Sequence, residues 1–94
     1  MAELTFTKEE NLGMACQAIA CGDEGVVTFS VKMADGKAHK LLAQHSVDGV
    51  NWQSIGVMEF AGYAELNVDG LRPNVQKARI VLLDFATPQS AQWV

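Results

Sequence analysis

The sequence predicts an all-β protein: a small antiparallel β-sandwich of six or seven strands with extended N- and C-terminal arms. Apolar and polar residues alternate with a period of two through most of the chain, as in strands with one buried face. Turn-forming pairs, among them three Asp-Gly pairs, separate these segments at the spacing of about 8–12 residues that is typical of sandwiches. The chain has 94 residues, of which 49% are hydrophobic. This is enough for one core, so we expect a single domain over residues 1–94.

The N-terminal third of the chain has the weakest strand pattern. Leu4 and Phe6 alternate with two threonines, which predicts a short strand or an arm within residues 1–10. Residues 11–21 allow two interpretations. Their alanines, methionine and glutamine favour a helix, whereas their alternation places apolar residues on one face of a strand: Leu12, Met14, Cys16 and Ala18. The regular strand spacing of the remaining chain favours the strand.

Two strands are predicted in the middle of the chain. Residues 26–33 alternate strictly, and the residues expected on their buried face are Val27, Phe29, Val31 and Met33. The pair Asp35-Gly36 follows and is a strong hairpin signal. Residues 38–46 form the next strand, in which two adjacent leucines are expected on opposite faces.

Two further strands are predicted after an Asp-Gly turn. Residues 51–58 resume the alternation with a change of parity between Trp52 and Ile55, which indicates a β-bulge or a bend. After a weak Ala-Gly break, residues 64–68 alternate cleanly and predict a half-buried strand.

The last predicted strand, residues 77–85, carries apolar residues on both faces, so we expect it to be central or covered on both sides. A loop containing Arg72-Pro73-Asn74 precedes it, and Phe85 is expected to be buried. Residues 87–94 show no strand pattern and are expected to form the C-terminal arm. Removing residues 89–94 should therefore leave the thermal stability of the isolated domain nearly unchanged.

The acidic composition argues against several classes of function. The formal net charge is -4, so the chain lacks the basic patch that supplies most affinity for nucleic acid. Neither nucleic acid nor a membrane is an expected partner. Acidic residues near the N-terminus, with no apolar region after them, predict no signal peptide, so we expect synthesis in the cytoplasm. In that reducing compartment Cys16 and Cys21 are predicted to be two buried thiols.

No catalytic or metal-binding arrangement is expected. His45, Ser46 and Asp48 are close in sequence, but neighbours on a strand point to opposite faces, which argues against a catalytic triad. His39 and His45 lie roughly 20 Å apart along one strand, too far to share a metal ion. Both histidines are expected at the surface, and Glu9-Glu10 are expected to be solvated turn charges. The chain is therefore predicted not to be an enzyme and to need no metal and no cofactor.

The most specific segment is residues 44–52, Gln-His-Ser-Val-Asp-Gly-Val-Asn-Trp. We predict a hairpin corner in which Ser46 and Asp48 accept backbone hydrogen bonds and Gly49 takes a positive φ. Trp52 then returns to cover the turn. The corner is interpreted as structural. The alternative is that Trp52 is an exposed aromatic residue that contacts a sugar or a protein.

This corner resembles one found in small β-sandwich proteins of tailed-bacteriophage virions. The matched residues are Ser46, Asp48, Gly49 and Trp52 in the corner and Arg79 in a later strand. Similar corners occur in discoidin-like and carbohydrate-binding sandwiches. The phage resemblance implies a non-enzymatic structural role, most simply that of a capsid decoration (cement) protein that binds the outer surface of the assembled shell and stabilises it. It also implies location in the virion, the major capsid protein or other virion subunits as partners, and a homo-oligomer such as a trimer.

Two other functions remain open at the level of sequence. One is a different virion part, namely a tail-tube, head-completion or baseplate piece. The other is a carbohydrate-binding module, whose candidate exposed aromatic residues are Trp52, Phe60, Tyr63 and Trp93. In a decoration protein the two arms would contact neighbouring subunits, because arms can add strands to other sheets and tryptophan is frequent at interface hot spots. The partner-binding residues predicted on this basis are Leu4, Phe6, Trp93 and Val94. The alternative is that both ends fold back on their own sandwich.

Overall fold

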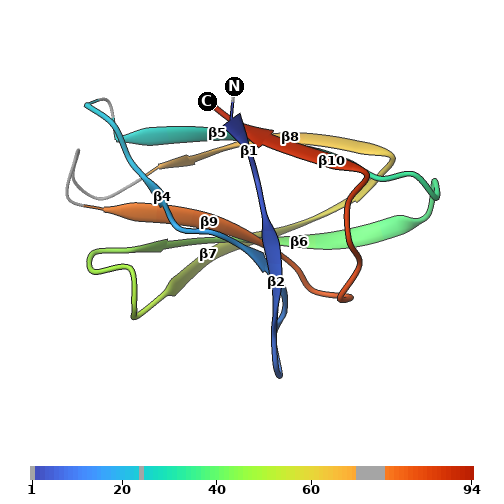
Figure 1. Ribbon diagram of the computed structural model, residues 1–94, viewed down its shortest axis with the longest axis horizontal. Helices are drawn as coiled ribbons and strands as arrows, with labels where there is room; N and C mark the ends of the chain where they lie inside the picture. Colours follow the sequence, from blue (N-terminus) through green and yellow to red (C-terminus); the bar gives the residue numbers. More distant parts are fainter. Residues whose placement is uncertain (1, 24, 70–75) are drawn as a thin grey trace.

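The computed structural model confirms the all-β prediction, with two antiparallel sheets that pack against each other (Figure 1). The structure describes residues 2–23, 25–69 and 76–94, and the predicted loop at Arg72-Pro73-Asn74 lies outside them. Sheet A contains, in order, β1 (Ala2–Glu3), β10 (Ser90–Trp93), β5 (Val26–Lys32) and β8 (Tyr63–Asp69). Sheet B contains, in order, β2 (Phe6–Glu9), β3 (Gly13–Cys16), β9 (Lys77–Leu82), β6 (Ala38–Ser46) and β7 (Gln53–Ala61), with β4 (Ile19–Ala20) beside β9.

The main core lies between the two sheets, where alternate residues of the strands meet. Val27, Phe29 and Val31 of β5 are buried there as predicted, and Met33 joins them just beyond the strand. From the two central strands of sheet B come Leu41, Ala43, Ile80 and Leu82. Burying a side chain of the size of Phe29 contributes about 2–3 kcal/mol, so this strict alternation is a main source of stability.

The outer face of sheet B carries a second, smaller apolar cluster. Leu42 and Val81 are buried there beside Ala15, and Leu12 and Leu83 pack against them. The cluster explains why β6 and β9 are apolar on both faces, since their residues alternate between the main core and this outer layer. The predicted opposite facing of the two leucines and the predicted double cover of the last strand are both confirmed.

The turn at Asp35-Gly36 is not a hairpin, contrary to the prediction. β5 pairs with β10 and β8, whereas β6 pairs with β7 and β9, so this turn carries the chain from sheet A to sheet B. Gly36 does have a positive φ, 68°, as a tight turn favours. Turn residues specify a local reversal, but the need of each strand to bury one face against the other sheet decides its neighbours.

β6 and β7 do form a hairpin, and the predicted bulge lies in β7. Ala43 pairs with Gly56 and Gln44 pairs with Ser54, so Ile55 is the extra residue between them. β7 then ends at Ala61, and Gly62, with a φ of 81°, returns the chain to sheet A as β8. β7, the second strand of this hairpin, is therefore the edge strand of sheet B.

The C-terminal residues form a strand, which corrects the prediction of an arm without strand structure. β10 lies between β1 and β5, with Ala91 opposite Val31 and Trp93 opposite Phe29. Its alternation of apolar and polar residues covers only four positions, too few to stand out in the sequence. Such short strands, β1, β4 and β10, raise the number above the six or seven predicted.

The N-terminal segment connects the two sheets. β1 pairs with β10 at the edge of sheet A, and the chain then crosses to sheet B, where β2 is the edge (Figure 1). Leu4 and Phe6 pack against the main core along this crossing. The N-terminal segment therefore covers one open side of the sandwich.

Residues 11–21 form two short strands, β3 and β4, so the strand interpretation is confirmed and the helix is excluded. Met14 and Cys16 face the main core as predicted. Leu12 packs instead against the outer cluster, and Ala18 is exposed. The predicted single face is therefore right only within β3.

β9 ends at Leu82, earlier than the predicted end at residue 85. Phe85, expected to be buried, is 42% exposed and has a positive φ of 62°. Its backbone N–H donates to the Leu82 carbonyl oxygen, so the chain turns where continued alternation indicated a strand. The Lys8 ammonium group lies 5.6 Å from the centre of the Phe85 ring.

Both cysteines are buried free thiols, as predicted. The Cys16 sulfur accepts a hydrogen bond from the backbone N–H of Ile80 at 3.3 Å. Burial raises the pKa of Cys16 to about 11 and also raises the pKa of Cys21. The thiols are therefore protonated and unreactive at neutral pH.

Candidate functional site

The predicted corner between β6 and β7 is organised around one carboxylate. Ser46 Oγ donates to Asp48 Oδ1 at 2.8 Å and accepts from the backbone N–H of Gly49 at 2.8 Å. Asp48 Oδ1 also accepts from the backbone N–H groups of Val50 and Asn51, at 2.8 and 2.9 Å. These backbone donors, with the Ser46 hydroxyl, hold the pKa of Asp48 well below its usual value. The side chains of the motif thus satisfy the polar groups of their own turn.

Gly49 has the predicted positive φ, 78°. A β-branched side chain is strained in this left-handed region, so we expect Gly49→Val to lower the free energy of unfolding by about 1–2 kcal/mol. Urea denaturation monitored by circular dichroism measures this change. Gly22→Val is the matched control, because a Cβ there meets no atom within 4 Å. An unchanged midpoint for Gly49→Val would contradict the assigned turn.

Trp52 leaves the corner to stack on Arg79. The guanidinium carbon lies 4.3 Å from the centre of the Trp52 ring. Arg79 Nε donates to Gln44 Oε1 at 2.7 Å, and its two terminal nitrogens donate to the Glu9 carboxylate at 2.9 and 3.2 Å. Glu9 is thus the last residue of β2 and pairs with a buried arginine, although its side chain stays 44% exposed; Glu10 is exposed in the following turn, as predicted. We call these four residues the Arg79 network; it joins β2, β6, β9 and the corner.

The aromatic residues proposed for sugar binding do not form a flat exposed surface. Trp52 is half-buried with Arg79 against its ring, and Phe60 is buried. Trp93 is half-buried and packs against the main core. Of the four candidates, only Tyr63 is exposed.

The predicted partner-binding residues are mostly engaged within the chain itself. Leu4, Phe6 and Trp93 are half-buried and pack against the main core. Val94 exposes its side chain, but its backbone N–H and C=O both pair with Thr28. The structure therefore uses these residues to close the sandwich.

His39 and His45 are buried, which corrects the prediction that they lie at the surface. His45 Nδ1 lies 3.0 Å from the Asp69 carbonyl oxygen, whereas the Ser46 hydroxyl bonds to Asp48, so the two side chains have different hydrogen-bond partners. No three metal-ligating side chains gather within the described ranges. The predicted divergence of His45 and Ser46 is confirmed.

His39 lies between two carboxylates. Its Nε2 is 2.9 Å from Asp35 Oδ1, and its Nδ1 is 2.5 Å from Asp84 Oδ2. The hydrogen bonds to Asp35 and Asp84 raise the pKa of His39 above its usual value. The ring thus connects the turn that changes sheets with the turn after β9.

This raised pKa makes stability depend on pH. The imidazolium contributes stability that is fully present below about pH 6.5, the ordinary His pKa, and that is lost as pH rises through the folded-state pKa. We expect the Tm of the wild type to fall as the pH rises from about 6.5 through the folded-state pKa of His39. The variant His39→Gln should not show this fall. Asp35→Asn should reduce it while leaving the ring in place. Equal pH slopes for the wild type and His39→Gln would contradict the assignment.

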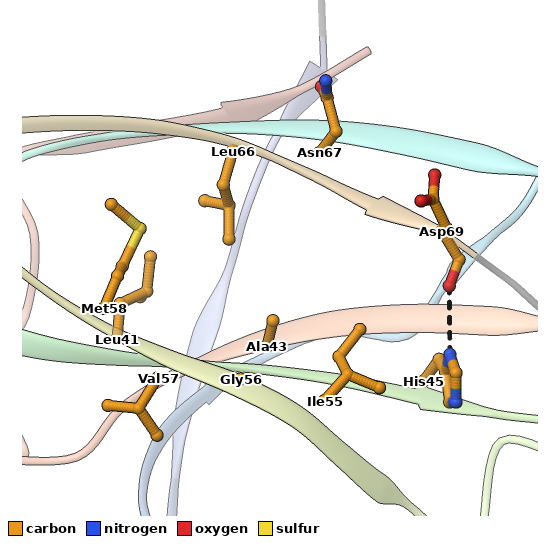
Figure 2. Close-up of a pocket in the computed structure, with 10 residues that line it drawn as sticks. All are labelled: Leu41, Ala43, His45, Ile55, Gly56, Val57, Met58, Leu66, Asn67 and Asp69. Carbon is orange, nitrogen blue, oxygen red and sulfur yellow. Dashed lines mark hydrogen bonds between the residues drawn. The ribbon is translucent and has the colours of Figure 1, made fainter.

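The sequence did not reveal a groove on the side of the sandwich opposite the N-terminal segment. It lies between β7, the edge of sheet B, and β8, the edge of sheet A, and has a volume of about 500 Å3. Leu41, Met58 and Leu66 point into it, whereas Val57 points away (Figure 2). We call this the β7–β8 groove. In the sequence, the only trace of this groove is the break in alternation around Gly56, and that break is interpreted as a β-bulge.

Comparisons with known proteins identify no matching family model, no similar curated protein and no similar solved structure. Among the described residues no helix has the length and apolar character needed to cross a membrane. The residues and geometry of this chain therefore carry the functional interpretation.

Proposed function

We propose that this chain is a non-enzymatic structural protein of a bacteriophage virion, most simply a capsid decoration protein that binds the assembled shell and stabilises it. The observation that carries the proposal is the open side formed by β7 and β8. There, two strand edges that pair with no other strand of the described residues meet around an apolar groove. Ile55 and Val57 of β7 are 43% and 58% exposed. Exposed edges with apolar side chains favour pairing with another chain.

The corner supports the virion part of the proposal. The resemblance to phage sandwich proteins includes a Ser-x-Asp-Gly-x-x-Trp corner and an arginine in a later strand. Trp52 and Arg79 are in direct contact, so both parts of the pattern belong to one structural unit. The proposed partners are the major capsid protein or other virion subunits, and the proposed assembly is a homo-oligomer such as a trimer.

The non-enzymatic part is supported by how the polar side chains are used. Ser46 is bonded to Asp48, and His45 to the backbone of Asp69. His39 bridges two carboxylates at the turns. Ser46, His45 and His39, the residues best suited to nucleophilic or general acid–base chemistry in this region, thus each have a structural partner.

Binding of the purified protein to expanded, assembled shells of the phage that encodes it tests the proposal. We expect saturable binding near the local three-fold positions and a higher melting temperature of the shell. Ile55→Lys, beside the β7–β8 groove, should weaken binding, whereas Ser30→Lys, on β5 in sheet A, should not. No binding to shells would overturn the decoration role. Rings or tubes of the pure protein would favour a tail part, and glycan binding lost in Trp52→Ala would favour the carbohydrate alternative.

A further inference from the structure

The two sides of the sandwich are closed differently. On one side the N-terminal segment runs from β1 in sheet A to β2 in sheet B, and Leu4 and Phe6 pack against the main core. On the other side β7 and β8 are joined only through Gly62. Met58 and Leu66 pack against the core there but remain partly exposed. Within residues 2–23, 25–69 and 76–94, no extended segment covers the β7–β8 side as the N-terminal segment covers the opposite side.

The β7–β8 groove runs along the strands between two fixed points. Toward Gly62 the side chains of Phe60 and Ala64 are buried in the core. At the other end His45 Nδ1 lies 3.0 Å from the Asp69 carbonyl oxygen and bridges the two sheets (Figure 2). The extended chain from Ala64 to Asp69 spans roughly 17 Å. The groove therefore has the length of one short strand.

The edges of β7 and β8 differ in how well they can pair with an added strand. β8 pairs with β5 along its whole length without a register shift, so its free edge is regular. β7 carries the bulge at Ile55, and bulges interrupt edge pairing. An added strand therefore fits β8 better and would lie over the side chains of β7.

The charges beside the groove are acidic. β7 and β8 contain Glu59, Glu65 and Asp69 and no lysine or arginine. Glu59 lies opposite Lys40 of β6. On β8, Lys32 of β5 lies opposite Tyr63 and so beside Glu65, whereas Asp69 lies opposite Val26 with no basic residue across from it. A second copy would bring the same acids, and its residues 3–10 hold three glutamates and one lysine. A basic segment is thus favoured over self-association.

We propose that the β7–β8 groove binds one extended, basic segment of a partner protein by strand addition to β8. An aliphatic side chain of that segment enters the groove between Met58 and Leu66, and flanking lysines or arginines lie beside Glu65 and Asp69. The inference rests on the proposed function, since it states how a partner subunit docks. Main-chain bonds supply affinity in this mode, while the groove and the charges supply specificity.

A random linear peptide library selected on the full chain tests the inference. We expect the enriched peptides to contain an aliphatic residue flanked by Lys or Arg and to slow amide exchange in β8. Glu65→Gln should weaken binding of such a peptide by about threefold and reduce its salt dependence. Enriched peptides that protect other strands, or an absence of enrichment, would overturn the inference.

Gly56→Leu is the decisive variant, because a Cβ at Gly56 meets no atom within 4 Å and a larger side chain enters the groove. It should weaken peptide binding by about tenfold or more. Gly22→Leu, at an equally open glycine outside the groove, should leave binding unchanged. Equal binding by both variants would overturn the inference, as would a wild-type dimer that Gly56→Leu dissociates.

Shell binding separates this inference from the proposed function. If wild type and Gly56→Leu bind shells equally well, the decoration role stands and the groove is not its docking site. If peptides select as expected but no shell is bound, strand addition stands and the decoration role fails.

Discussion

Deletion of residues 89–94 is expected to destabilise the domain strongly, with a fall in Tm of more than about 12 °C, since roughly 4–8 °C corresponds to 1 kcal/mol at this size. The deletion removes β10 from between β1 and β5. It takes Ala91 and Trp93 out of the core and breaks the backbone pairing of Val94 with Thr28. Thermal unfolding followed by circular dichroism measures the change.

The exposed end of the same segment provides the control. The Val94 side chain is 64% exposed, so Val94→Ala should change the free energy of unfolding by less than about 0.5 kcal/mol. A truncated chain that melts within about 4 °C of the wild type would show that β10 does not belong to the folded sheet. The sequence alone predicted such a small effect of the truncation on thermal stability, whereas the pairing of β10 with β1 and β5 predicts a large one.

Replacing Arg79 by leucine is expected to lower the free energy of unfolding by about 2–3 kcal/mol. Gln44 is buried, and its Oε1 loses the donor that Arg79 Nε supplies at 2.7 Å. The stack with Trp52 is lost as well. Arg79→Lys should not restore stability, because a lysine cannot reproduce the planar, bidentate contacts. Urea unfolding followed by tryptophan fluorescence measures these changes.

Glu9→Gln is the informative comparison for the Arg79 network. The Glu9 side chain is 44% exposed, so its ion pair is screened by water and its loss should cost less than about 1 kcal/mol. If Arg79→Leu is no more destabilising than Glu9→Gln, the buried contacts with Gln44 and Trp52 do not contribute as argued.

The structure moves the proposed contact surface from the chain ends to another part of the molecule. The sequence pointed to the two ends of the chain as contact surfaces, but Leu4, Phe6 and Trp93 pack against their own core. The surface that we propose for a partner is instead the β7–β8 groove. Neither edge strand is unusual by itself, and the groove exists only because consecutive strands belong to different sheets.

The sequence by itself determined the features that depend on nearby residues. The buried face of β5, the bulge in β7 and the corner were all predictable. Alternation and turn chemistry act over a few positions, and the corner bonds join residues no more than three apart. Strand β10 was missed because it has only four residues, too few for the alternation to be recognised in the sequence.

Only the tertiary structure decided which distant residues meet. Arg79 contacts Gln44 across 35 positions and Glu9 across 70. His39 reaches Asp84 across 45 positions. Whether Asp35-Gly36 makes a hairpin or a change of sheet, and whether a histidine is exposed or buried between acids, depends on how the sheets stack. Stacking is set by the joint burial of all strands, which no local pattern contains.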